Sequence, residues 1–115
     1  MDSLDVTHVF CGIAVRDFSA ATSWYERLFG RPPDIRPHDT EAVWNLAQGG
    51  LVYVVADSER AGGGQVMLMV PDLDEALSVA AQRGLRSAPV EVLGSGARKA
   101  TLTDPDGNRV SLGQV

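Results

Sequence analysis

The feature that most constrains the fold of this chain is an internal repeat, each copy of which spans about half of the chain. A shift of 55 residues brings hydrophobic positions and a turn residue of the two halves into register: Ile13 with Leu68, Val15 with Val70, Asp17 with Asp72, Ala21 with Ala76 and Ser23 with Ser78. A period of this length indicates two copies of one supersecondary unit.

Each copy begins with a short apolar strand and continues into an amphipathic helix, as the spacing of its apolar residues indicates. Asp17 and Asp72 immediately precede the helical patterns, where a carboxylate can accept hydrogen bonds from the free N–H groups of the first turn. Gly30 and Gly84 follow the patterns, where left-handed helix ends are expected. The two halves therefore predict a strand and a capped helix each.

Three further β-like runs follow each helix. Turn sequences join the last two runs of each half, with Gly-Gly in the first and Pro-Asp-Gly in the second. We expect strands at 9–15, 34–37, 41–47 and 50–56, and again at 65–70, 88–92, 97–103 and 108–114. The sequence thus predicts an α+β fold of two β-α-β-β-β modules in one domain over 1–115, with module one at 6–57, a linker at 58–64 and module two at 65–115.

Composition excludes several classes of protein. Ten Lys and Arg against fifteen Asp and Glu give a net charge of -5, whereas a nucleic-acid-binding domain needs a basic surface. No apolar run approaches the roughly 20 residues of a membrane-spanning helix. The single cysteine, Cys11, excludes an intramolecular disulfide, and the first residues lack the regions of a signal peptide. We therefore expect a cytoplasmic protein without nucleic-acid or membrane partners.

Three motifs, in order along the chain, resemble those of the vicinal-oxygen-chelate superfamily of glyoxalases, extradiol dioxygenases and bleomycin-resistance proteins. They are Val15–Phe18, Trp24–Gly30 and Asp104–Asn108, which are similar to the family's Val-x-Asp-Leu, Phe-Tyr-x-x-x-Leu-Gly and Asp-Pro-Asp-Gly-Asn signatures. The resemblance covers nearly the whole chain. It implies a curved mixed sheet around a cup that holds a metal or a ligand. We also expect a homodimer, because unpaired edge strands are a liability.

The resemblance also implies where metal ligands would lie, at the start of the first strand and the middle of the last strand of each module. Those positions carry Phe10 and Tyr53 in module one and Gln65 and Ser111 in module two. Zinc, iron and manganese prefer several imidazole or carboxylate ligands. Phenylalanine cannot coordinate a metal, and Gln65 would be the one acceptable ligand. We therefore expect neither a metal nor another cofactor at this position.

Other donors leave an alternative open. His8 shares the strand face of Phe10, and His38 and Glu41 lie at a loop and a strand end, so these three could rebuild a metal site. Cys11 has the opposite parity and is expected to face the helices.

Alternation along the strands predicts the lining of the cup. Strand 97–103 contributes either Lys99 and Thr101 or Arg98 and Ala100, and its register stays open. Apolar walls with a few polar groups are typical of small-molecule sites, although the same residues could fill a collapsed cup as core. The predicted ligand-binding residues are Phe10, Trp44, Tyr53, Gln65, Met67, Met69, Arg109 and Ser111.

These observations favour a metal-free binding protein of the bleomycin-resistance type, which sequesters an aromatic or amphipathic small molecule such as an antibiotic. No catalytic residue is predicted. The alternatives are a metal-dependent lyase, isomerase or dioxygenase of the same superfamily with an altered metal site, and an interaction domain whose cup is filled.

Overall fold

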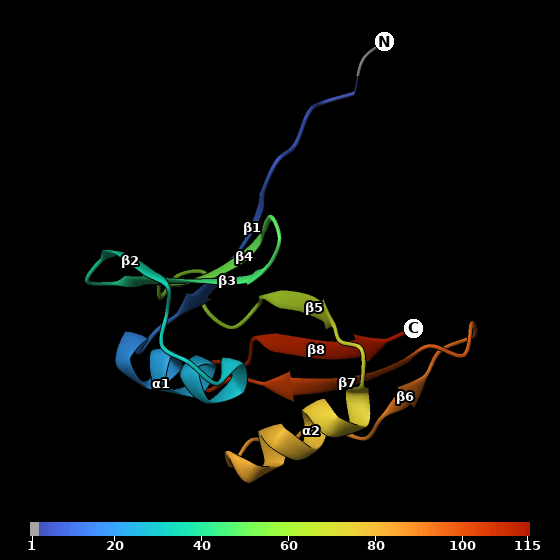
Figure 1. Cartoon of the computed structure of the whole chain (residues 1–115). Coiled ribbons are helices and arrows are strands. Elements are labelled where there is room, and N and C mark those ends of the chain that lie inside the picture. The colour runs from blue at the N-terminus through green and yellow to red at the C-terminus, as the bar shows by residue number, and fades with distance from the viewer. Residues whose placement is uncertain (1–2) are drawn as a thin grey trace.

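The computed structural model describes residues 3–115 and contains the unit β-α-β-β-β twice (Figure 1). The first copy comprises β1 (Val9–Val15), α1 (Phe18–Phe29), β2 (Ile35–His38), β3 (Glu41–Ala47) and β4 (Gly50–Ala56). The second comprises β5 (Gln65–Met69), α2 (Leu73–Gln82), β6 (Glu91–Val92), β7 (Arg98–Thr103) and β8 (Arg109–Gln114). The repeat therefore predicts the element order correctly. Neither helix is long and apolar enough to cross a membrane, within the residues described.

The two copies form two four-stranded sheets with the same topology. The strand order is β1-β4-β3-β2 in the first sheet and β5-β8-β7-β6 in the second. The first and last strands of each copy pair in parallel, and the other pairs are antiparallel, so both sheets are mixed. This confirms the predicted α+β fold. Each first strand lies at the edge of its sheet and pairs on one side only.

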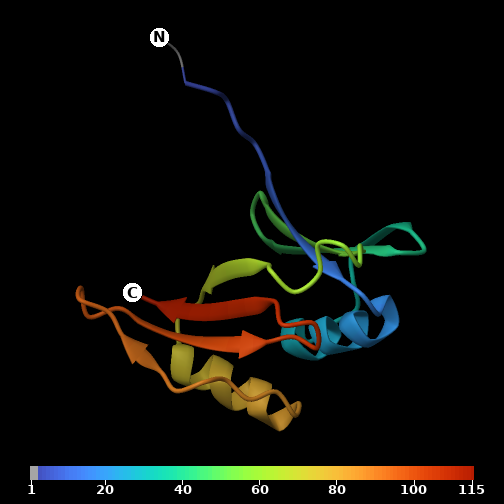
Figure 2. The same cartoon turned by 180° about the vertical axis from the view of Figure 1, so that it is seen from behind.

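Both helices lie on the same side of the two sheets (Figures 1 and 2). The face of each sheet opposite its helix is called its open face below. Apolar residues on the helix side form one core cluster that draws on both copies. Its largest fully buried members include Ile13, Tyr25, Trp44, Leu73 and Leu102.

The predicted helix caps are present. The Asp17 carboxylate accepts a hydrogen bond from the backbone N–H of Ala20 at 3.1 Å, and the Asp72 carboxylate accepts one from Glu75 at 3.1 Å. Helix α1 ends at Gly30, whose φ of 79° lies in the left-handed region that glycine adopts at low cost. Local sequence signals therefore set both helix starts.

A buried hydrogen-bond network joins the second copy to the first at the Asp104–Asn108 turn. The carboxylate of Asp104 accepts from the backbone N–H groups of Asp106 and Asn108 at 2.8 and 2.9 Å. It also accepts from the phenol of Tyr25 at 2.8 Å and from the Asn108 side chain at 2.8 Å. The same Asn108 amide donates to the carbonyl of Ala14 at 2.9 Å. This motif therefore positions the β7–β8 hairpin against module one.

Candidate functional site

Four predicted site residues lie together on the open face of module two. Gln65 and Met67 of β5 lie directly opposite Arg109 and Ser111 of β8 in the parallel register. Residues opposite each other on neighbouring strands share a face. The alternation read from the sequence therefore groups these four side chains correctly.

The register of β7 decides which of its residues join them. Thr101 lies opposite Ser111, and the two hydroxyl oxygens are 2.8 Å apart, in hydrogen-bond contact. Lys99 shares the face of Thr101 because the two are separated by one residue. Arg98 points to the helix side instead, where its guanidinium pairs with the carboxylate of Asp74 on α2 at 3.1 Å. The open face thus receives the Lys99 and Thr101 pair.

These side chains line a polar pocket of about 420 Å³ on the open face of module two. Sequence reasoning had assigned no role to Glu91, which lies opposite Lys99 in the β6–β7 pairing. The pocket is lined by Gln65, Val66, Met67, Glu91, Lys99, Thr101, Arg109 and Ser111.

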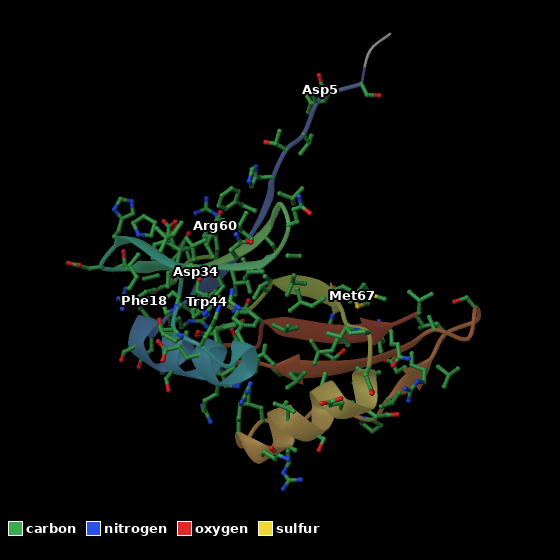
Figure 3. All side chains as sticks on the ribbon, viewed as in Figure 1. Asp5, Phe18, Asp34, Trp44, Arg60 and Met67 are labelled. Atoms are coloured by element: carbon green, nitrogen blue, oxygen red, sulfur yellow. The ribbon has the colours of Figure 1, made fainter. Side chains whose placement is uncertain are left out.

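Met67 of the edge strand β5 lines the apolar border of this pocket, and Met69 follows it on the same strand. Met67 and Met69 are 46% and 56% exposed, and Figure 3 shows Met67 on the side of the sheet away from α2. Both lie against Gly113 of β8, where an added Cβ would be 2.9 Å from the Met69 sulfur and 3.2 Å from the Met67 sulfur. The absence of a side chain at Gly113 therefore lets both thioethers lie across β8.

An apolar cavity of about 580 Å³ adjoins the same edge strand. It lies between α1, β5 and α2, and its lining includes Phe29, Met67, Met69 and Val79. Met67 contributes to both this cavity and the polar pocket. The side chains of β5 thus separate a polar surface from an apolar one.

The open face of module one carries two more predicted residues, Phe10 and Tyr53. Phe10 is 55% exposed, whereas Tyr53 is half-buried. Tyr53 lies opposite Gly12 in the β1–β4 pairing, and its ring covers that glycine. A Cβ added at Gly12 would lie 2.4 Å from the Tyr53 ring. The Tyr53 ring therefore fills the space that the missing side chain of Gly12 leaves on the open face.

The prediction that Trp44 lines the cup is wrong. Its side chain has no exposed surface and packs on the helix side, with ring centroids 5.3 Å from Phe29 and 6.3 Å from Tyr25. The indole N–H donates to the carbonyl of Arg31 at 3.0 Å. Figure 3 shows Trp44 in the layer between sheet and α1. Trp44 therefore belongs to the core and offers no platform to a ligand.

A β-bulge explains this error. The pairing of β3 with β4 shifts by one residue at Leu46. Without that shift, the hairpin register would oppose Trp44 and Tyr53 on the open face. The bulge instead places Val43 opposite Tyr53 and Trp44 opposite Val52. A shift by one residue turns every later side chain to the other face.

The residues at the metal-ligand positions that the resemblance implies do not fit a metal. Tyr53 and Ser111 occupy equivalent points, because their partners Gly12 and Met67 are themselves equivalent in the repeat. With Phe10, these positions offer hydroxyls but no imidazole or carboxylate, and Gln65 supplies one amide. Soft and borderline divalent metals are held by several nitrogen, thiolate or carboxylate ligands.

The donors elsewhere do not gather either. His38 and Glu41 are partners across the β2–β3 turn, and exposed His8 makes its hydrogen bond to Thr7 at 3.0 Å. No group of three His, Cys, Asp or Glu side chains in the described part of the chain could hold a metal ion. Cys11 packs against the core on the helix side, as its parity predicts, and burial raises the pKa of its thiol.

Comparison with solved structures identifies the fold and the family. No family model and no curated protein sequence matches the chain. A glyoxalase/bleomycin resistance protein from Catenulispora acidiphila is 46% identical, and the match covers 94% of this chain and 97% of that one with a TM-score of 0.89.

More distant structures share the fold alone. A bleomycin-binding protein in complex with bleomycin is 24% identical over 94% of this chain and 98% of that one, with a TM-score of 0.72. A lactoylglutathione lyase from Agrobacterium tumefaciens is 16% identical over 91% and 90%, with a TM-score of 0.78. Two mixed sheets with one helix each and a 46% identical structure of the same fold together show that the chain belongs to the glyoxalase/bleomycin resistance protein family.

Proposed function

We propose that this protein sequesters a small aromatic or amphipathic molecule on its open faces and makes or breaks no bond. The observation that carries the proposal is the pocket of about 420 Å³ on module two. It combines a few convergent polar groups with an apolar border, which is typical of small-molecule sites. The donor chemistry at the family's metal-ligand positions supports a function that needs no metal.

The side chains of the two modules make different kinds of contact with the ligand. Phe10 and Tyr53 offer aromatic surface on module one, and Met67 offers a thioether, which adapts to irregular shapes. On module two, Gln65 and Ser111 supply hydrogen bonds. The distant neighbour that holds bleomycin makes antibiotics of that kind a reasonable first class of ligand to test.

We further propose a homodimer. The edge strands β1 and β5 each pair on one side only, and long unpaired edges invite association. Exposed apolar side chains flank both edges, with Phe10 on β1 and Met69 on β5. A second copy could cover these edges and complete a cup. Sedimentation velocity should give a dimer of about twice 12.3 kDa, and a monomer at tens of micromolar would contradict this proposal.

A cytoplasmic location stays a prediction, testable by cell fractionation.

The first experiment measures metal content and ligand response on protein purified without a metal-affinity tag. We expect substoichiometric metal and a raised Tm with one or more planar aromatic compounds or bleomycin. A ligand at a hundredfold excess over its Kd stabilises the fold by about 2.7 kcal/mol. Near-stoichiometric metal with a chelator-sensitive activity would instead support the lyase, isomerase or dioxygenase alternative.

Variants locate the bound compound. Ser111→Ala and Met67→Ala should weaken its binding, because both residues line the pocket. Ser78→Ala, on the exposed surface of α2, is the matched control and should bind as the parent does. Unchanged binding by both pocket variants would exclude this pocket as the site.

A further inference from the structure

The pocket on module two carries two basic side chains that have no carboxylate partner within residues 3–115. The chain is acidic overall, with a net charge of -5. Neither Lys99 nor Arg109 has a carboxylate oxygen within 4.0 Å, among the residues that the structure describes, and both line this pocket. Four other arginines of residues 3–115 do form ion pairs: Arg16, Arg31, Arg60 and Arg98.

The polar groups between these two cations donate hydrogen bonds. The hydroxyls of Thr101 and Ser111 are 2.8 Å apart. One hydroxyl proton serves this contact, whichever residue donates it, so the other remains free to point into the pocket. Lysine and arginine are donors only. An oxyanion can accept several of these hydrogen bonds at once, and such charge-assisted bonds are about twice as strong as neutral ones.

Glu91 is the single carboxylate among the lining residues. It lies on the short outer strand β6, opposite Lys99. Arg109 lies on β8, and β7 separates it from Glu91. Two cations and one carboxylate leave the lining with a formal charge of +1, opposite in sign to the charge of the whole chain. A ligand with a negative group is thus favoured at the Arg109 side.

The apolar border sets how far the charge of the ligand lies from its hydrophobic part. Met67 on β5 and Lys99 on β7 are separated by the single strand β8. Neighbouring strands are about 4.8 Å apart, so the thioether and the ammonium group belong to strands about 10 Å apart. That span suits one or two fused rings with an anionic substituent at one end.

We propose that the pocket selects an amphipathic anion, whose carboxylate, sulfonate or phosphate lies between Arg109 and Lys99 and whose rings pack on Met67. This inference rests on the proposed binding function and adds the charge class of the ligand.

A matched pair of fluorescent probes tests the charge preference. The anionic dye 8-anilinonaphthalene-1-sulfonate and its uncharged analogue N-phenyl-1-naphthylamine share one ring system and differ by the sulfonate. The folded protein should bind the anionic dye at saturable stoichiometry. Arg109→Gln and Lys99→Gln should each weaken this binding about 10- to 140-fold, the range of a hydrogen bond to a charged group. Binding of the uncharged analogue should change less than about twofold, since it forms no charge-assisted bond.

Two further variants separate a local contact from general charge effects. Arg86→Gln makes the same change of charge at an exposed position outside the pocket, and should leave both dyes unaffected. Glu91→Gln should strengthen binding of the anionic dye, because it removes the one negative group of the lining. Dye binding to all variants is measured at one temperature, well below the Tm of the least stable variant.

The outcomes distinguish this inference from the proposed function. If both dyes bind and neither Arg109→Gln nor Lys99→Gln affects the anionic one, the anion preference is wrong and the binding function stands. A loss of affinity for the anionic dye in Glu91→Gln would likewise overturn the preference. If neither dye binds to the folded protein and the wider ligand panel gives no shift, both proposals fail.

Discussion

Replacing Tyr25 with phenylalanine tests whether the network at the Asp104 turn holds the two modules together. The Tyr25 side chain has no exposed surface, and its hydroxyl donates to the 4% exposed Asp104 at 2.8 Å. Tyr25→Phe leaves that carboxylate oxygen with the Asn108 amide as its remaining partner. A hydrogen bond to a buried charged group is worth about 1.5–3 kcal/mol. For a domain of this size we expect a fall in Tm of about 6–15 °C.

The chain offers a matched control, since its other tyrosine, Tyr53, is half-buried on the open face of module one. Tyr53→Phe removes a hydroxyl that donates no hydrogen bond to a described residue, and should change stability by less than about 0.5 kcal/mol. Urea unfolding followed by circular dichroism gives both free energies. Equal stability of Tyr25→Phe and the parent would refute the role assigned to this network.

The same residue predicts a pH dependence. Burial, followed by the charge of Asp104, raises the pKa of Tyr25 well above its ordinary value of about 10. The folded state then keeps a proton that the unfolded state releases. This contribution to stability is complete below pH 10 and falls by about 1.4 kcal/mol per pH unit above it. Tyr25→Phe should lose that slope between pH 10 and 11, whereas Tyr53→Phe should keep it; identical slopes would contradict the assignment.

Three further predictions follow from the core and the linker. Trp44→Phe should lower the free energy of unfolding by about 2–4 kcal/mol, since it leaves a cavity and removes the donor to the Arg31 carbonyl. Ligand affinity should not change, and weaker binding at full stability would place Trp44 in the binding site. Gly62→Ala should destabilise the protein by about 1–3 kcal/mol, because the φ of Gly62 is 96° and a Cβ would lie 2.7 Å from the Asp106 carbonyl oxygen. The control Gly63→Ala meets no atom within 4 Å and should differ from the parent by less than about 1 kcal/mol. Equal losses of stability in chemical denaturation would show that the linker geometry is wrong. The Cys11 thiol, whose pKa burial raises, should react with a disulfide reagent at pH 8 at least about tenfold more slowly than in urea, and equal rates would contradict its position.

The fold was predictable because its determinants are local or periodic. Asp17 and Asp72 mark the helix starts by chemistry that depends on three or four residues. The repeat supplies the pairing that local signals lack, since it requires two copies of one unit. Alternation within β5 and β8 then groups Gln65, Met67 and Ser111 on one face.

The site was less predictable because it depends on register between strands. The bulge at Leu46 sends Trp44 into the core, and a single extra residue in a hairpin has no clear sequence signature. The face of Lys99 stayed open until the pairing of Thr101 with Ser111 fixed it. Glu91 had no assigned role because its place in the pocket follows from β6, a strand of two residues.

On strand β8, the side chains buried in the core and those that line the pocket occupy opposite faces. On β8, Val110 and Leu112 are buried in the core, while Arg109 and Ser111 line the pocket. The Asp104 network secures this strand from one end, without using a residue of its open face. Substitutions on the open face can therefore alter the charge and shape of the pocket at little cost to the fold. This separation makes the binding tests decisive, because a variant such as Arg109→Gln that loses a ligand should still unfold at the Tm of its parent.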